Sequence, residues 1–287
     1  MASEVVRGID FPAALDAGLA PEQFHRRFLV EGDSWMDRSS LWQPSLPDSL
    51  AAHYNLHPGQ GSVLLVSIAR FGDTIDNMGR TESGEFGLWL QTSFNQWKFD
   101  GVLLSGGGND IIDAARDPQP GEGILRSFAK GPAPASAQDC INLDALGDLV
   151  AQRMDPGFLK LYDAVQDSPC KNIPIFLNDY DFPTPRNAPA TQGGKSWLYE
   201  AFVKNSIPPA MWQELTDLIF IHLQMTIASW TRGRPTVRLV PTSGTLVPAE
   251  PGTTGSSNDW LNEIHPNTSD WVKLARVWHK AIREVLP

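Results

Sequence analysis

The chain of 287 residues carries 33 acidic and 23 basic residues, and its net charge of −10 opposes attraction to nucleic acid or to an anionic membrane. Hydrophobic residues (41%) and charged residues (20%) occur in proportions typical of a globular protein rather than a disordered one. No stretch approaches the roughly eighteen apolar residues of a membrane span, and residues 1–20 lack the apolar run of a signal peptide. We therefore expect no nucleic-acid partner, no transmembrane segment and a cytoplasmic location, although export without an N-terminal signal would leave no trace here.

Apolar runs that end in polar or glycine-bearing loops predict five buried strands. Segments with helical periodicity or helical end signals separate them. This alternation predicts an α/β fold with a doubly wound parallel sheet of about five strands, in a single domain over 1–287. Three long loops follow strands, so we expect them to project from one sheet edge and to wall a pocket. The predicted strands are 28–30, 62–69, 101–105, 173–178 and 236–241, the helices are near 49–55, 84–97, 141–165, 208–230 and 270–285, and the long loops are 117–138, 183–197 and 242–258.

A serine follows the first predicted strand directly, in the sequence Gly32-Asp33-Ser34. Functional sites of parallel α/β sheets assemble at the C-terminal ends of the strands, so Ser34 is a candidate nucleophile. Taken alone, the tripeptide favours an ordinary turn or helix cap, because Asp and Ser hydrogen-bond their own backbone in such places. The rest of the chain decides between these interpretations.

Three later loops supply the other groups that a serine hydrolase needs, namely a general base, a group that orients it and donors for an oxyanion. Gly72 follows the second predicted strand, and Asn109 follows the third. His265 is the only histidine in a loop after the last predicted strand, with Asn262 three residues before it. Each feature also has a plain structural interpretation: Gly72 as a loop glycine with positive φ, and Asn109 with Asp110 as the cap of a following helix. Their convergence at strand ends favours catalysis.

These residues resemble, in order, the four sequence blocks of the SGNH (GDSL) hydrolase superfamily: Gly32-Asp33-Ser34, Gly72, Gly107-Gly108-Asn109-Asp110 and His265-Pro266. The resemblance covers about residues 27–280. It implies a flavodoxin-like three-layer α/β/α sandwich and the hydrolysis of carboxylic esters, as in an esterase or lipase, through an acyl-enzyme. Carried over by position, Ser34 is the nucleophile and His265 the general base, and the oxyanion hole consists of the Ser34 N–H, the Gly72 N–H and the Asn109 side chain.

The chain departs from the family pattern at the residue that orients the histidine. The family usually has Asp three residues before it, whereas this chain has Asn262. An Asn oxygen can hold the ring, but it supplies no charge to an imidazolium, and loss of that charge is costly in a serine protease. Three alternatives stay open: orientation by Asn262, a substitute carboxylate from Glu263 or Asp259, or a weakened enzyme.

The same departure keeps two other functions under consideration, an acyltransferase on the same scaffold and a non-catalytic module that binds carbohydrate or lipid. The expected partner is a small-molecule, lipid or sugar ester, with Trp35 and Trp260 close to it. Tyr180 and Asp181, after the fourth strand, form either a pocket wall or a simple turn. No metal or organic cofactor is indicated, because zinc motifs are absent and residues 192–196 match only the end of a P-loop. The two cysteines, Cys140 and Cys170, are expected to be reduced.

Overall fold

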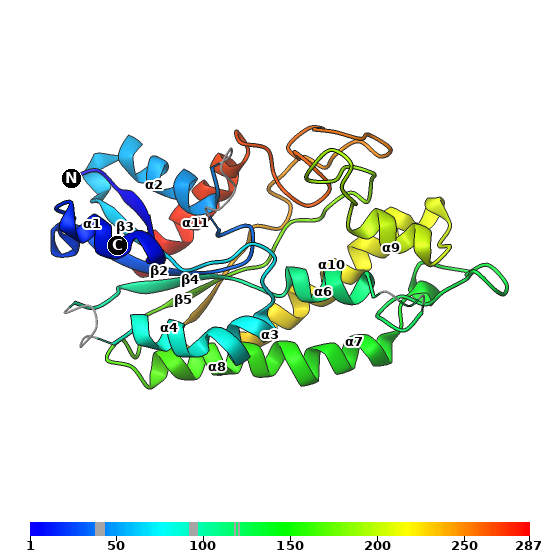
Figure 1. Ribbon diagram of the computed structural model, residues 1–287, viewed down its shortest axis with the longest axis horizontal. Coiled ribbons are helices and arrows are strands. Elements are labelled where there is room, and N and C mark those ends of the chain that lie inside the picture. Colours follow the sequence, from blue (N-terminus) through cyan, green and yellow to red (C-terminus); the bar gives the residue numbers. More distant parts are fainter. Residues whose placement is uncertain (38–43, 92–96, 118, 120) are drawn as a thin grey trace.

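A six-stranded sheet forms the centre of the structure, a computed structural model that describes residues 1–37, 44–91, 97–117, 119 and 121–287 (Figure 1). All neighbouring strands are parallel, in the order β1-β3-β2-β4-β5-β6. The predicted α/β class is confirmed, with one strand more than expected. The strands are β1 (Glu4–Arg7), β2 (Arg26–Gly32), β3 (Val63–Ser67), β4 (Gly101–Ser105), β5 (Ile175–Asn178) and β6 (Val237–Val240).

The additional strand, β1, lies at the sheet edge and pairs with β3. Only Val5 and Val6 of this strand are buried, between an exposed Glu4 and an exposed Arg7. A two-residue apolar run is too short for the pattern that predicts a buried strand. The pairing therefore depends on β3, nearly sixty residues later in the chain, rather than on a local signal.

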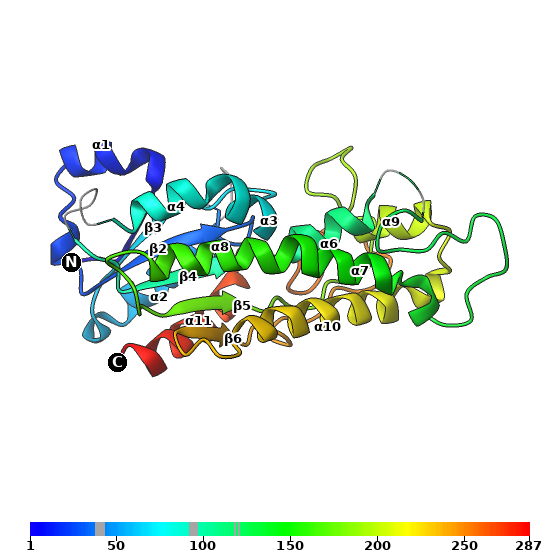
Figure 2. The ribbon, with the colours of Figure 1, turned by 90° about the horizontal axis from the view of Figure 1, so that it is seen from below.

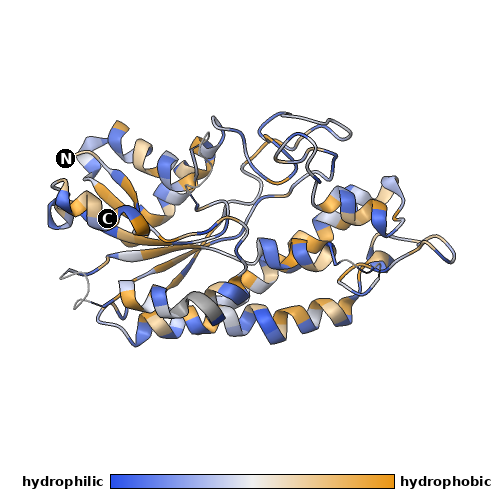
Figure 3. Cartoon of the chain, in the orientation of Figure 1, coloured by the Kyte–Doolittle hydropathy of each residue, from blue (hydrophilic) through white to orange (hydrophobic). Residues whose placement is uncertain are grey.

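Helices cover both faces of the sheet, which confirms the three-layer sandwich. In Figures 1 and 2, α2 and α11 lie on one face, and α4 and α8 lie on the other. Figure 3 shows apolar residues concentrated along the central strands, and β2 to β5 are buried over most of their length. The helices are α1 (Phe11–Asp16), α2 (Leu46–Leu56), α3 (Ile75–Asn77), α4 (Ser83–Trp89), α6 (Gly108–Ala115), α7 (Leu143–Leu149), α8 (Asp155–Gln166), α9 (Leu198–Lys204), α10 (Trp212–Trp230) and α11 (Trp271–Val285).

Several helices differ from their predicted bounds. The helix predicted over 84–97 ends at Trp89, and residues 92–96 of that range lie outside the described part. The helix predicted over 141–165 consists of α7 and α8 joined by a π-helical segment, Val150–Met154. The short helices α1, α3 and α9 were not among the predicted ranges.

The order of the strands positions the functional site. The chain crosses from β2 to β3 on one side and then to β4 on the other, so the direction of winding reverses at β2. Loops at such a switch point separate and leave room for a ligand at the C-terminal ends of the strands. Figure 1 shows α6, α9 and α10 extending beyond that end of the sheet, with the loops after β5 and β6 beside them. No helix within the described ranges is both long and apolar enough to cross a bilayer.

Candidate active site

The loop after β2 carries Ser34 on a tight turn whose first residue must be glycine. Gly32 has φ of +148°, and a Cβ atom at this position would lie 2.5 Å from the carbonyl oxygen of Ser105 in β4. A backbone oxygen cannot move away without breaking the sheet, so a side chain is excluded here. The close approach of two strands thus explains the glycine of the Gly-Asp-Ser sequence.

The Asp33 side chain is buried and stabilises the turn rather than facing solvent. Its Oδ1 accepts hydrogen bonds from the Trp35 N–H (3.0 Å) and the Ser105 hydroxyl (3.1 Å), and its Oδ2 accepts one from the Tyr180 hydroxyl. Burial raises the pKa of Asp33 to about 6, although the hydrogen bond from Tyr180 acts in the opposite direction. Tyr180 therefore reaches the serine turn, a contact that the sequence left undecided.

Ser34 and His265 meet although 231 residues separate them in the chain. The Ser34 Oγ lies 2.8 Å from the His265 Nε2, and the His265 Nδ1 lies 3.0 Å from the Asn262 Oδ1. The same Oδ1 accepts the backbone N–H groups of Ile264 (3.0 Å) and His265 (2.9 Å). Because backbone N–H groups only donate, the atom that faces them is the oxygen of Asn262. The hydrogen therefore sits on Nδ1, and Nε2 is free to accept the serine proton.

The imidazole of His265 is held between two aromatic rings. Its centroid lies 6.1 Å from that of Phe71, with the rings inclined by 22°, and 5.6 Å from that of Trp197, with the rings inclined by 72°. The Trp35 indole N–H donates to the Ile264 carbonyl at 3.2 Å, which ties the serine turn to the histidine loop. Burial lowers the pKa of His265 to about 4, since the charged ring would lose solvation.

Glu263 is fully buried and engages the start of α9 rather than His265. Its carboxylate accepts backbone N–H groups from Arg186 (3.2 Å), Trp197, Leu198 (3.0 Å) and Tyr199 (2.7 Å). Burial raises its pKa to about 7, and these four donors act against that rise. The carboxylate occupies the place of a helix cap, contributed from a distant part of the chain.

Replacing Glu263 by Gln should destabilise the protein by about 2–5 kcal/mol, because an NH₂ group would face backbone N–H groups and leave buried donors unpaired. Thermal or denaturant unfolding of the variant measures this loss. Glu284→Gln is the matched control, since Glu284 is exposed on α11. Equal stability of the two variants would contradict the capping role of Glu263.

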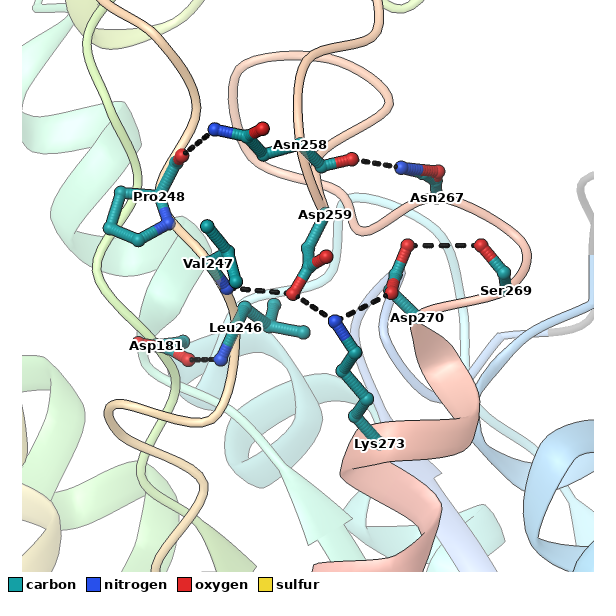
Figure 4. A network of polar contacts seen from close by, with 10 residues as sticks. All are labelled: Asp181, Leu246, Val247, Pro248, Asn258, Asp259, Asn267, Ser269, Asp270 and Lys273. Atoms are coloured by element: carbon teal, nitrogen blue, oxygen red, sulfur yellow. Dashed lines mark hydrogen bonds and ion pairs between the residues drawn. The ribbon is translucent and has the colours of Figure 1, made fainter.

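Asp259 also has partners away from the histidine (Figure 4). Its Oδ2 accepts the Val247 N–H at 2.7 Å and lies 2.5 Å from the Lys273 Nζ, which also pairs with Asp270 at 3.0 Å. Of the three orienting residues considered from sequence, only Asn262 has its side-chain oxygen at His265, whereas Glu263 and Asp259 are committed to other contacts.

Arg186 organises the backbone around Asn262, and nothing in the sequence pointed to it. The side chain is buried, and its guanidinium donates to the carbonyls of Asn262 (2.7 Å) and Gly255 and to the Thr253 hydroxyl (3.2 Å). Arginine suits this place because its planar group offers five donors in fixed directions. Arg186, from the loop after β5, therefore joins two parts of the loop after β6, one at Thr253 and Gly255 and the other at Asn262.

Each of the three residues expected to supply an oxyanion donor has an N–H that can still donate. Gly72 has φ of +77°, and neither its N–H nor that of Ser34 donates a hydrogen bond within the described part of the chain. The Asn109 Nδ2 donates to the Asp73 carbonyl at 2.9 Å, which leaves the second hydrogen of that amide for another acceptor. The loops after β2, β3 and β4 thus each bring one candidate donor.

Asp110 has a different position from the one the sequence suggested. It lies within α6, which begins at Gly108, so Asn109 and Asp110 do not cap a helix that starts at Ile111. Its carboxylate instead accepts the N–H groups of Ile75 (2.8 Å) and Asp76 (3.3 Å) at the start of α3. Burial raises the pKa of Asp110 to about 7. The side chain joins α6 to the start of α3, which follows the loop that carries Gly72.

A small cavity of about 20 Å³ opens beside Ser34. Trp35 and Trp260 line it, as do Tyr180 and Asp181, which the sequence left as either a pocket wall or a simple turn. Of the described residues in the three long loops, only Pro183 lines this cavity, although Trp197 of the 183–197 loop packs on the His265 ring. The 117–138 loop packs against the end of α9, and the 242–258 loop is held by hydrogen bonds to Asp179 and Asp181.

Comparison with known proteins gives a match in fold. No protein-family model and no curated protein sequence matches the chain. Phospholipase A1 from Streptomyces albidoflavus is 13% identical with a TM-score of 0.51, over 89% of this chain and 99% of the phospholipase. The chain therefore shares its α/β fold with this phospholipase. The acetylxylan esterase Axe2 from Geobacillus stearothermophilus gives a TM-score of 0.48 at 12% identity, over 93% and 97% of the two chains.

This fold agrees with the α/β/α architecture that the resemblance in the sequence implies. It places the four motif blocks at the strand ends where the fold assembles ligand sites. At these identities the similarity extends to the architecture, and the roles of individual side chains depend on the geometry described above.

Proposed function

We propose that this chain is a serine esterase that cleaves carboxylic esters through an acyl-enzyme on Ser34. The observation that carries the proposal is the 2.8 Å contact between the Ser34 Oγ and the His265 Nε2, in a tautomer that Asn262 fixes. A nucleophile, its base and an orienting acceptor in line are the signature of nucleophilic catalysis. The N–H groups of Ser34 and Gly72, which donate to no described residue, and the Asn109 amide support an oxyanion hole.

In the first half of the proposed reaction, the His265 Nε2 takes the Ser34 proton as Oγ bonds to the ester carbonyl carbon. The electron pair of the C=O bond moves to oxygen, and the N–H groups of Ser34 and Gly72 and the Asn109 amide donate to it. The tetrahedral intermediate collapses, the bond to the alcohol oxygen breaks, and the alcohol leaves with the proton from Nε2.

The second half repeats these steps with water. His265 takes a proton from water as the hydroxide oxygen bonds to the acyl carbon, the Ser34 ester bond breaks, and Oγ regains the proton. The acid product leaves, and the free enzyme is restored.

Labelling with a fluorophosphonate, together with assays on p-nitrophenyl esters, tests the proposed function. We expect covalent labelling of Ser34 and ester turnover that the reagent abolishes. A protein that is neither labelled nor active would be a binding module rather than an enzyme. Acyl transfer to an added alcohol in preference to water would identify an acyltransferase.

The pH profile should retain activity well below neutrality. His265 acts as a base only when neutral, and burial lowers its pKa from 6.5 to about 4, so the basic form persists as the pH falls to about 4. We expect kcat/KM for p-nitrophenyl acetate to fall below that pH. A fall centred near pH 6.5 in a protein that remains folded would contradict the lowered pKa of His265.

A further inference from the structure

The cavity beside Ser34 is the part of the site that distinguishes one ester from another. Its volume of about 20 Å³ is room for about one water-sized group, given that a water needs roughly 10–15 Å³ by this measure. Ser34 and Asn109 line it, and its apolar lining includes Ile112 of α6 and Phe220 of α10.

The residues that line the cavity indicate which substituent of the ester it receives, if the proposed function is correct. The carbonyl carbon bound to Ser34 would carry three other groups: the oxyanion, the leaving oxygen and the acyl chain. The oxyanion faces Gly72 and Asn109, and the leaving oxygen must face the His265 Nε2 to be protonated. His265 is not among the described residues that line the cavity, so the leaving oxygen is not directed into it. Beyond Asn109 the lining includes the apolar side chains of Ile112 and Phe220, which offer an oxyanion no donor, so the acyl chain is the group assigned to the cavity.

The walls of the cavity are packed side chains that cannot easily yield. Ile112 and Phe220 are each only 4% exposed, and Ile264 and Trp260 are buried as well. Interiors are close-packed, so an added methylene forces neighbours out of their preferred rotamers. By contrast, Phe71 on the histidine side is 59% exposed, and that side can accept a larger alcohol.

We propose that the preferred substrates are acetyl esters, and that Ile112 and Phe220 set the limit on acyl length. A methyl group is close to a water molecule in size and fits the cavity, whereas each further methylene meets these two side chains. One methylene in an apolar pocket changes discrimination by about 10–200-fold. We therefore expect kcat/KM to fall by at least about ten-fold from acetate to butyrate.

The experiment measures kcat/KM on p-nitrophenyl acetate, propionate, butyrate, hexanoate and octanoate for the wild type, Ile112→Ala and Phe220→Leu. Each variant should raise the ratio of butyrate to acetate turnover by about ten-fold. The matched control is Ile111→Ala, because Ile111 is equally buried on the same helix but does not line the cavity. Its ratio should equal that of the wild type. Ile112→Val replaces Ile112→Ala if the latter does not fold.

The outcomes separate this inference from the proposed function. Turnover that depends on Ser34 but favours octanoate over acetate would overturn the acetyl assignment and leave the esterase intact. A preference for acetate that is unchanged in the Ile112 and Phe220 variants would overturn the role of the cavity. No labelling of Ser34 and no turnover of any ester would overturn the proposed function itself.

Discussion

Ser34→Ala should abolish ester turnover, with kcat/KM reduced by about 10⁵-fold or more, while the protein remains folded. The variant removes the atom that forms the acyl-enzyme and leaves His265 with no proton to accept. Members of a catalytic unit act together, so losing one costs nearly as much as losing all. Among the described residues, the Ser34 side chain bonds to His265 alone, so the stability should change little.

Steady-state assays on p-nitrophenyl acetate, with circular dichroism and thermal unfolding as measures of folding, check this prediction. Ser256→Ala is the matched control, since Ser256 is exposed in the loop after β6. Its activity should equal that of the wild type. Turnover by Ser34→Ala above a few per cent of the wild type would assign the reaction to another nucleophile.

Asn262→Ala should lower kcat by about 10²–10⁴-fold, the second largest effect. The Asn262 Oδ1 accepts hydrogen bonds from the His265 ring and from two backbone N–H groups. Without this oxygen, neither the tautomer of His265 nor the conformation of its loop is fixed. In a serine protease, a catalytic histidine held in the wrong tautomer lowers kcat by about 10⁴-fold. The Asn262 oxygen holds His265 in the correct tautomer. Asn267→Ala is the control, because its side chain bonds to Asn258 and away from the histidine.

Asn262→Asp should raise kcat, whereas Asn262→Ala should lower it. A carboxylate would keep the acceptor and add a negative charge beside Nδ1, which raises the pKa of His265 and stabilises the imidazolium that forms during catalysis. We expect a higher kcat at neutral pH and an acidic limb that moves upward from about pH 4. If the acidic limb of the pH profile does not move in Asn262→Asp, that limb reports the titration of another group. For the alanine variant, wild-type activity in Asn262→Ala would show that Asn262 has no part in the mechanism.

The sequence predicted the features that local patterns encode. Apolar runs located β2 to β6, and short motifs at their ends located Ser34, Gly72, Asn109 and His265. These residues each follow a strand, so a sheet of known direction is enough to bring them to one edge. The edge strand β1 was not predicted, because its two buried valines are too few to form a periodic pattern.

The supporting contacts could not be predicted, because they join residues far apart in the chain. Glu263 caps α9 from 64 to 66 residues away, and Tyr180 bonds to Asp33 across 147 residues. An acidic residue beside a histidine is a natural candidate to orient it, and only the fold shows that Glu263 faces the other way. Arg186 likewise lies in a loop without a motif, and its role depends on the carbonyls that surround it.

The most direct test of the central claim is to trap the covalent intermediate. The enzyme is mixed with excess p-nitrophenyl acetate, quenched with acid within milliseconds to seconds, and analysed by intact and peptide mass spectrometry. We expect a mass increase of one acetyl group on the peptide that contains Ser34, and no such increase in Ser34→Ala. Ester turnover with an acetyl group on a different residue, at a rate that matches turnover, would contradict it.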